Sequence, residues 1–210
     1  MLTARFKIKG LYAITPDELN TAELLRKVAL VLRGGAQVLQ YRNKLANAEL
    51  RLAQAVALRE LSNEFATTFI INDDVQLAQQ VAADGVHLGG DDASIAEARK
   101  QLGNNKIIGA SCYNRLQLAQ QATLQGADYV AFGAFFASSV KPNAPVATVE
   151  LLQQARLELN VPLVAIGGIT LQNAKQLIAA GADALAVISS VFNADDIQAA
   201  AQQFSELNFS

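Results

Sequence analysis

The amino-acid sequence predicts a (β/α)8 TIM barrel, an α/β fold in which eight parallel strands each lead into a helix, as a single domain over residues 1–210. Eight short apolar runs rich in β-branched residues alternate with eight longer segments that have the apolar spacing of helices. One strand and one helix together take roughly 26 residues, which is comparable with the length of a parallel strand and its crossover helix. Eight units of similar length close naturally into a barrel.

The eight expected strands are nearly continuous in apolar residues. Parallel strands that are buried on both faces have this composition. In chain order the strands are expected at Gly10–Thr15, Val38–Tyr41, Thr68–Asn72, Gly85–Leu88, Ile107–Ser111, Tyr129–Phe132, Leu163–Ile166 and Ala184–Ile188.

Helical spacing is clear between the second and third strands, where apolar residues recur every three or four positions from Leu50 to Leu61. An open, doubly wound sheet is the alternative fold, but it usually has fewer strands and a glycine-rich first turn. The first turn here, Pro16–Asn20, contains no glycine, so the barrel is favoured. The expected helices are Thr21–Arg33, Ala46–Glu64, Val75–Ala82, Ile95–Leu102, Leu116–Gln125, Val149–Leu157, Asn173–Ala180 and Ile197–Phe204.

Short, similar motifs stand directly before the even-numbered strands. A glycine at the end of a helix can adopt the left-handed conformation that stops the helix, and this explains most of the pattern. The recurrence every two units suggests an ancestral doubled unit. The motifs are Gly35-Ala36-Gln37, Asp84-Gly85, Gly126-Ala127-Asp128 and Gly181-Ala182-Asp183.

The composition excludes several classes of protein. With 51% hydrophobic and 17% charged residues the chain is not disordered, and its net charge of −2 argues against a nucleic-acid binder. One cysteine cannot form a disulfide within the chain, and one histidine cannot form a histidine cluster for zinc. No apolar run reaches the roughly 18 residues of a membrane span, and the first residues lack the apolar core of a signal peptide. We therefore expect a cytoplasmic protein without a membrane or nucleic-acid partner.

Polar residues gather where the expected strands end, which is the edge that carries the active site in barrels of this class. Because the C-terminal ends of the strands meet at one rim, these side chains are expected to surround one site. The residues that end or follow the second to eighth strands are Gln40–Lys44, Asn72–Asp74, His87–Asp92, Ser111, Gly133–Lys141, Gly167–Thr170 and Ser189-Ser190.

Two carboxylates at neighbouring strand ends, Asp73 and Asp92, are candidate ligands of one Mg²⁺ ion. Neighbouring strands lie about 4.8 Å apart. Hard oxygen ligands suit Mg²⁺ that is bound together with substrate phosphates. The alternative role for acidic residues in these positions is to cap the following helix, which applies above all to Asp74 and Asp91.

Three cations on the same rim, Arg42, Lys44 and Lys141, are candidates for a pyrophosphate clamp beside the metal. Taken singly, each has the alternative of being a solvated surface charge. Gly167-Gly168 and Ser189-Ser190 follow the last two strands, where backbone N–H groups and helix N-termini often hold a phosphate. Two phosphate sites at one mouth suggest two phosphorylated substrates or a bisphosphate.

The single histidine and the single cysteine have structural roles as their first interpretation. His87 lies within the fourth expected strand, where a buried and hydrogen-bonded imidazole is the commoner state. Cys112 directly follows Ser111 and is expected to be an inert, packed thiol rather than a nucleophile.

Several stretches of the chain carry a family resemblance. They are Gln40-Tyr41-Arg42-x-Lys44, Ile71–Asp74, Asp84–Gly89 with Asp92, Gly109-x-Ser111, Gly126–Val130, Lys141 and Ile166–Ile169. Each stretch is short, but the shared order and spacing are specific, and the likeness runs through nearly the whole chain. The sequence resembles thiamine-phosphate synthases, which have a (β/α)8 barrel. Such enzymes transfer the pyrimidine of 4-amino-2-methyl-5-hydroxymethylpyrimidine pyrophosphate to a thiazole phosphate and require Mg²⁺.

The resemblance also implies roles for individual residues. Those assigned to the pyrophosphate are Arg42, Lys44, Asn72 and Lys141, and those assigned to the pyrimidine are Gln40 and Ser111. The thiazole phosphate is assigned to Gly168, Ile188 and Ser189, with Ser138 beside the thiazole, and Mg²⁺ is assigned to Asp73 and Asp92. The catalytic residues among these are Arg42, Lys141 and Ser111.

The chain departs from the family pattern in two places. The family usually has glutamine at Gly90, and its loop after the sixth strand usually reads Pro-Thr-x-Thr-Lys where Ala137 to Lys141 read Ala-Ser-Ser-Val-Lys. Ser138 keeps a hydroxyl but Val140 does not, and the loss of one hydroxyl contact costs about 0.5–1.5 kcal/mol. We expect weaker binding of the thiazole phosphate without loss of the chemistry.

Other interpretations stay open at this point. Thiazole tautomerases are isomerases on the same barrel, but they generally lack the Asn-Asp-Asp run found at residues 72–74 and need no Mg²⁺. A lyase or isomerase of the tryptophan pathway would want a clear acid–base pair at the strand ends. A non-catalytic barrel that binds a phosphorylated ligand is favoured only by the altered loop. The oligomeric state is also open, a homodimer included.

Overall fold

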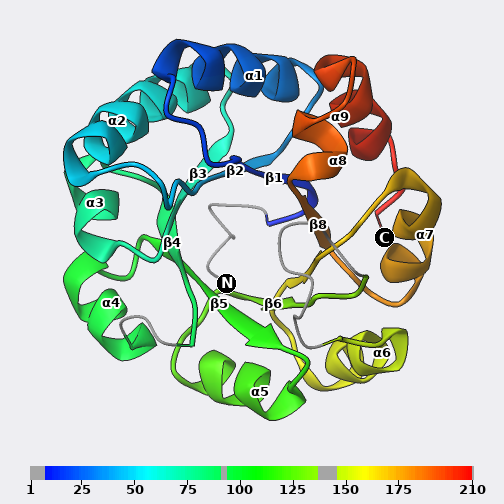
Figure 1. Ribbon diagram of the computed structural model, residues 1–210. Helices are drawn as coiled ribbons and strands as arrows, with labels where there is room; N and C mark the ends of the chain where they lie inside the picture. The colour runs from blue at the N-terminus through cyan, green and yellow to red at the C-terminus, as the bar shows by residue number, and fades with distance from the viewer. Residues whose placement is uncertain (1–7, 91–93, 137–145, 210) are drawn as a thin grey trace.

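The computed structural model describes residues 8–90, 94–136 and 146–209, which form a closed barrel of eight parallel strands (Figure 1). Each strand pairs with its neighbour in the chain, and β1 pairs with β8 to close the barrel. The predicted fold class is confirmed. The strands are β1 (Gly10–Ile14), β2 (Val38–Tyr41), β3 (Thr68–Asn72), β4 (Gly85–Leu88), β5 (Ile107–Tyr113), β6 (Tyr129–Phe132), β7 (Leu163–Ile166) and β8 (Ala184–Val187).

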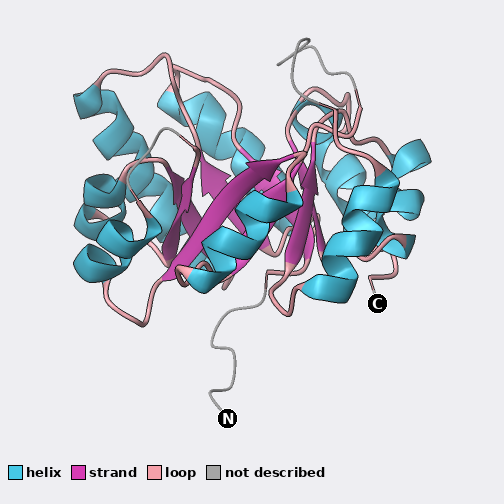
Figure 2. Cartoon of the chain, turned by 90° about the horizontal axis from the view of Figure 1, so that it is seen from below, coloured by secondary structure: helices cyan, strands magenta, loops and turns pink. Residues whose placement is uncertain are grey.

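Helices cover the outside of the barrel, as the side view in Figure 2 shows. The helix α9 packs against α1, so the ring of helices closes where the barrel closes (Figure 1). Among the described residues, no helix combines the length and the apolar character that a membrane span requires. The helices are α1 (Thr21–Arg33), α2 (Ala48–Glu64), α3 (Val75–Gln80), α4 (Ile95–Leu102), α5 (Leu116–Leu124), α6 (Val149–Glu158), α7 (Leu171–Ala179), α8 (Ser189–Phe192) and α9 (Ile197–Ser205).

The alternation of side chains along the strands creates two apolar cores. Outward-pointing residues such as Leu39 pack in the layer between the strands and the helices. Inward-pointing residues such as Val38 and Ile70 fill the barrel itself. Gln40 comes two positions after Val38, and Asn72 comes two positions after Ile70. Both side chains therefore point inward as well. The polar residues at the strand ends thus lie above an interior filled mostly by apolar side chains.

Several predicted element ends shift by one or two residues, and local hydrogen bonds explain two of the shifts. The helix α2 begins two residues later than predicted, because the Asn47 side chain caps its first turn. The helix α7 begins two residues earlier, since the Asn173 side chain accepts the N–H of Thr170 at 2.8 Å and so belongs to the first turn. The strand β5 continues to Tyr113, past an irregularity in its pairing with β6 that follows Ser111.

The sequence did not predict the single-turn helix α8. The predicted eighth strand included Ile188, whereas β8 ends at Val187 and α8 starts at Ser189. A segment of four residues is too short to show a helical period. The correction matters, because it places a helix N-terminus directly at the end of β8.

Three of the four motifs before the even-numbered strands share a role at the N-terminal end of the barrel. Asp84 accepts hydrogen bonds from the N–H of Phe69 in β3 and from Arg59 of α2, each at 2.8 Å. Two further groups repeat this arrangement two units apart, namely Asp128 with Ile108 and Arg99, and Asp183 with Leu163 and Arg156. Each aspartate therefore fastens a helix to a strand at the end opposite the expected active site, where barrels keep residues that serve stability. The repetition supports the doubled unit inferred from the sequence.

Replacing Asp84 with alanine is expected to lower the free energy of unfolding by about 2–3 kcal/mol, because the Phe69 N–H and Arg59 both lose a charged partner in a poorly exposed site. Urea denaturation followed by circular dichroism measures the change. Arg26→Ala is the matched control, since it breaks an ion pair with Glu23 on an exposed helix face and is expected to leave the midpoint unchanged. Equal midpoints for both variants would show that the repeated aspartates do not stabilise the fold.

Candidate active site

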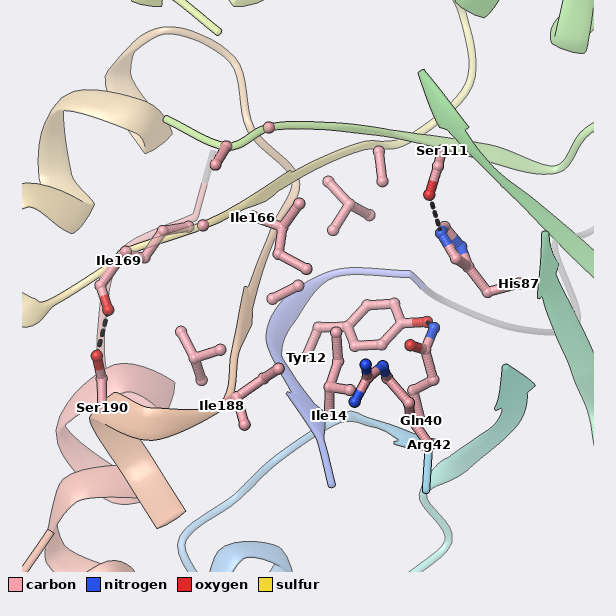
Figure 3. A pocket seen from close by; sticks show the side chains of 18 of the residues that line it. Tyr12, Ile14, Gln40, Arg42, His87, Ser111, Ile166, Ile169, Ile188 and Ser190 are labelled. Carbon is pink, nitrogen blue, oxygen red and sulfur yellow. Dashed lines mark hydrogen bonds between the residues drawn. The ribbon is translucent and has the colours of Figure 1, made fainter. Parts of the chain in front are cut away.

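A cavity of about 430 Å³ opens at the C-terminal ends of the strands, and all eight strands contribute to its wall. Figure 3 shows that residues far apart in the chain, among them Gln40, Ser111 and Ile188, line this one space. Lys44 and Asp73 lie on the rim beside it, joined by an ion pair of 3.9 Å. The predicted site residues that line the cavity are Gln40, Arg42, Asn72, Ser111, Gly168, Ile188 and Ser189.

The loop that follows β1 holds Arg42 in place. The Thr15 hydroxyl donates to the Arg42 carbonyl at 2.8 Å and accepts the Arg42 N–H at 2.9 Å. Asp17 pairs with the Arg42 guanidinium at 3.2 Å and accepts the N–H of Lys44 at 2.6 Å. Thr15, which the sequence analysis placed in the first strand, lies just beyond β1. The loop therefore fixes the backbone that carries both cations, and Asp17 balances one of them.

Asp73 occupies a strained turn at the end of β3. Its φ of +63° lies in the left-handed region, which aspartate tolerates better than most residues. Its N–H donates to the His87 carbonyl at 2.8 Å, so the turn is tied to β4. Backbone strain of this kind concentrates at functional sites. The next residue, Asp74, accepts the N–H of Leu77 and caps α3, which is the alternative role that the sequence analysis gave it.

Three predicted site residues, Asp92, Ser138 and Lys141, lie outside the described residues. Asp91 and the altered loop positions Ala137 and Val140 lie outside them too. Within residues 8–90, 94–136 and 146–209, no group of three or more histidine, cysteine or acidic side chains is placed to hold a metal ion. Gly90 is described, and its N–H donates to the Tyr113 hydroxyl at 3.2 Å.

The ends of β7 and β8 form a part of the cavity wall that is suited to bind an anion. Gly167 and Gly168 have φ values of +103° and +61°, which glycine adopts without strain. The Ser190 hydroxyl donates to the Ile169 carbonyl, which joins this turn to the start of α8 (Figure 3). No side chain caps the N-terminus of α8 at Ile188. Backbone N–H groups at such a helix start are suited to bind a phosphate.

The floor of the cavity contains polar residues that the sequence analysis did not assign to the site. Tyr12 and Tyr129 are fully buried inside the barrel and their hydroxyls lie 2.7 Å apart. His87 bonds the Tyr129 hydroxyl through Nδ1 and the Ser111 hydroxyl through Nε2, each at 2.9 Å. The expectation that His87 is a buried, hydrogen-bonded residue agrees with these contacts, but its ring also lines the cavity. One feature of the sequence could have identified the two tyrosines. Side chains alternate between the two faces of a strand, and both tyrosines occupy positions that point inward, as Gln40 and His87 do.

Cys112 is packed in the layer between strands and helices, next to Ser111 in sequence but away from the cavity wall. Burial raises the pKa of its thiol to about 12. The thiolate, which is the nucleophilic form, is therefore scarce near neutral pH. The structure supports the expectation of an inert thiol.

Comparisons with known proteins agree on one family. The thiamine monophosphate synthase family matches residues 11–191. A thiamine-phosphate synthase of Methylobacillus flagellatus is 59% identical over 200 residues, which make up 95% of this chain and 95% of that protein. One from Nitrosomonas eutropha is 53% identical over 97% of this chain and 96% of its own. A solved thiamine phosphate pyrophosphorylase from Pyrococcus furiosus has a TM-score of 0.84, 36% identity and 93% coverage of both chains.

Proposed function

The chain belongs to the thiamine monophosphate synthase family, and we propose that it condenses 4-amino-2-methyl-5-hydroxymethylpyrimidine pyrophosphate with 4-methyl-5-(2-phosphoethyl)thiazole to give thiamine phosphate and pyrophosphate. One observation carries the proposal. A single cavity has cations on its β2 side and an uncapped helix start with two glycines at the ends of β7 and β8, so it suits two phosphorylated molecules that meet between them. Such a biosynthetic role fits a cytoplasmic protein.

The two substrates are proposed to enter from opposite sides of the cavity. Arg42, Lys44 and Asn72 surround the pyrophosphate on the β2 and β3 side, with Lys141 beyond the described residues. Gln40 and Ser111 contact the pyrimidine above the barrel floor. The thiazole phosphate lies against Gly168, Ile188 and Ser189, and Ser138 is proposed to lie beside the thiazole. Holding both reactants in one orientation replaces an encounter in solution with a reaction inside one complex.

The proposed chemistry needs little acid–base help. The bond between the pyrimidine methylene carbon and the pyrophosphate oxygen breaks, and the electron pair leaves with the pyrophosphate. The lone pair of the thiazole nitrogen then forms a bond to the methylene cation and produces the thiazolium of thiamine phosphate. The nitrogen carries no proton that a base would have to remove. Arg42 and Lys141 stabilise the charge that collects on the departing pyrophosphate.

Asp73 and, beyond the described residues, Asp92 are the proposed Mg²⁺ ligands. Mg²⁺ is usually held through one or two carboxylates together with substrate phosphates, so the Asp73 carboxylate beside Asn72 fits an ion shared with the pyrophosphate. When bound, Mg²⁺ would neutralise part of the charge on the leaving group.

Purified protein, both substrates and Mg²⁺ are expected to yield thiamine phosphate and pyrophosphate in equal amounts. Removal of the metal with EDTA should stop the reaction, and added Mg²⁺ should restore it, because the leaving group loses and regains its charge partner. Chromatography of the thiamine phosphate and an enzyme-coupled assay for pyrophosphate measure the two products.

A folded protein that forms neither product in the presence of Mg²⁺ would overturn the proposal. Tight binding of the substrates without turnover would instead favour a non-catalytic barrel, and metal-independent isomerisation of a thiazole phosphate would favour a tautomerase.

A further inference from the structure

A chain of four hydrogen bonds crosses the floor of the cavity and joins five strands. The Gln40 amide of β2 donates to the Tyr12 hydroxyl of β1 at 2.8 Å, and Tyr12 meets the Tyr129 hydroxyl of β6 at 2.7 Å. Tyr129 meets His87 Nδ1 of β4, and His87 Nε2 meets the Ser111 hydroxyl of β5, each at 2.9 Å. Figure 3 shows both open ends, with the Gln40 amide at Tyr12 and Ser111 at His87. The two ends are the residues proposed to contact the pyrimidine.

The orientation of the Gln40 amide sets a direction in which all four bonds of this chain can run. With the Gln40 amide donating to Tyr12, every hydroxyl proton in the chain has a partner when Tyr12 donates to Tyr129 and Tyr129 donates to Nδ1 of a neutral His87. The imidazole proton is then on Nε2 and is donated to Ser111, whose own proton is left for the cavity. When the bonds run in this direction, Gln40 offers a carbonyl acceptor to a ligand and Ser111 offers a hydroxyl donor. A flipped Gln40 amide would reverse every bond, so that Gln40 would offer donors and Ser111 an acceptor.

The tyrosines keep the chain intact and rigid. Burial raises the pKa of both Tyr12 and Tyr129, so each hydroxyl retains the proton that the chain requires. Tyr129 is held against β5 at Gly109, where an added Cβ would lie 2.0 Å from the Tyr129 ring. This close fit explains why glycine stands at that position. The ring therefore has little room to leave the chain.

We propose that Tyr12, Tyr129 and His87 are positioning residues. They fix which of Gln40 and Ser111 presents a hydrogen-bond acceptor to the ligand and which presents a donor, and they thereby select an aminopyrimidine. The inference rests on the proposed function, which places the pyrimidine between Gln40 and Ser111. A ring with an amino group beside an unprotonated nitrogen offers one donor and one acceptor, which complements an acceptor at Gln40 and a donor at Ser111. The corresponding oxo ring carries a carbonyl beside a protonated nitrogen and presents the opposite pattern.

The test compares kcat/KM for the pyrimidine pyrophosphate and for its analogue in which an oxo group replaces the amino group. Tyr12→Phe and Tyr129→Phe each interrupt the chain while Gln40 and Ser111 themselves stay unchanged. Both are expected to lower the preference for the amino substrate by about tenfold, because the Gln40 amide can then turn over. Differences in intrinsic reactivity between the substrates cancel when variants are compared with the wild type. The KM for the thiazole phosphate should not change.

Tyr41→Phe is the matched control. It also removes a buried phenol hydroxyl, which donates to Gln54 outside the barrel interior, so it should leave the preference at the wild-type ratio. Preferences unchanged in both chain variants, while the wild type couples its substrates, would overturn the inference and leave the proposed function standing. A wild type that couples neither pyrimidine would instead count against the proposed function.

A double-mutant cycle provides an independent readout. Tyr12 and Ser111 are separated by two members of the chain, so residues with separate roles would have additive effects on the preference. We expect the Tyr12→Phe and Ser111→Ala effects to be clearly less than additive, because either change already breaks the same chain. Additive effects would overturn the inference, even if Tyr129→Phe failed to fold.

Discussion

Replacing Asp73 with alanine is expected to lower the kcat of the coupling reaction by about 100-fold or more. The change removes a carboxylate on the rim where the pyrophosphate and Mg²⁺ are proposed to bind, beside Lys44. Charge stabilisation of a departing anion is commonly worth several kcal/mol, which corresponds to this factor. Steady-state rates over a range of Mg²⁺ concentrations measure the effect, and half-saturation is expected to move to higher Mg²⁺.

Backbone strain complicates the alanine variant, and Asp73→Gly removes the complication. Alanine at a φ of +63° is strained by about 1–2 kcal/mol, whereas glycine accepts this conformation. The glycine variant should therefore unfold at a higher urea concentration than the alanine variant and yet be equally slow. If the glycine variant regained wild-type turnover, the effect of alanine would come from the distorted turn and the metal role would be wrong.

The fold could be predicted from the sequence because the strands of a barrel are buried on both faces. Continuous apolar runs and glycine-marked helix ends therefore identified all eight strands to within two residues. The shifted ends depend on single hydrogen bonds, such as the one that Asn173 accepts from Thr170, which no periodic pattern reveals. The helix α8 escaped prediction for a related reason, because one turn carries no period.

The rim of the site could be predicted, since charged and amide side chains stand out at the ends of apolar strands. Gln40, Arg42 and Asn72 are of this kind. The floor could not, because a tyrosine within an apolar run resembles a core residue until its hydroxyl partner is known. Tyr12 and Tyr129 lie 117 residues apart in the chain and meet only when the barrel closes.

Arg42→Ala is expected to lower kcat by about 100-fold or more, measured as product formation with both substrates and Mg²⁺ saturating. The guanidinium is poorly exposed, lines the cavity and is held by Asp17 at 3.2 Å, so it would meet the proposed pyrophosphate without having to be ordered first. Arg42→Lys keeps the charge but loses the planar fork, and an intermediate rate is expected. Equal rates for the wild type and the alanine variant would remove Arg42 from the mechanism.

A change at Asp17 separates two causes of the lower kcat of Arg42→Ala. In Arg42→Ala the Asp17 carboxylate loses its partner and faces the pyrophosphate, which adds repulsion to the missing attraction. A second change, Asp17→Asn, removes the charge while an amide oxygen can still accept the N–H of Lys44. The double variant should therefore be several-fold faster than Arg42→Ala alone, although still far slower than the wild type. If the second change slowed the enzyme further, Asp17 would be needed to hold the loop itself rather than to balance Arg42.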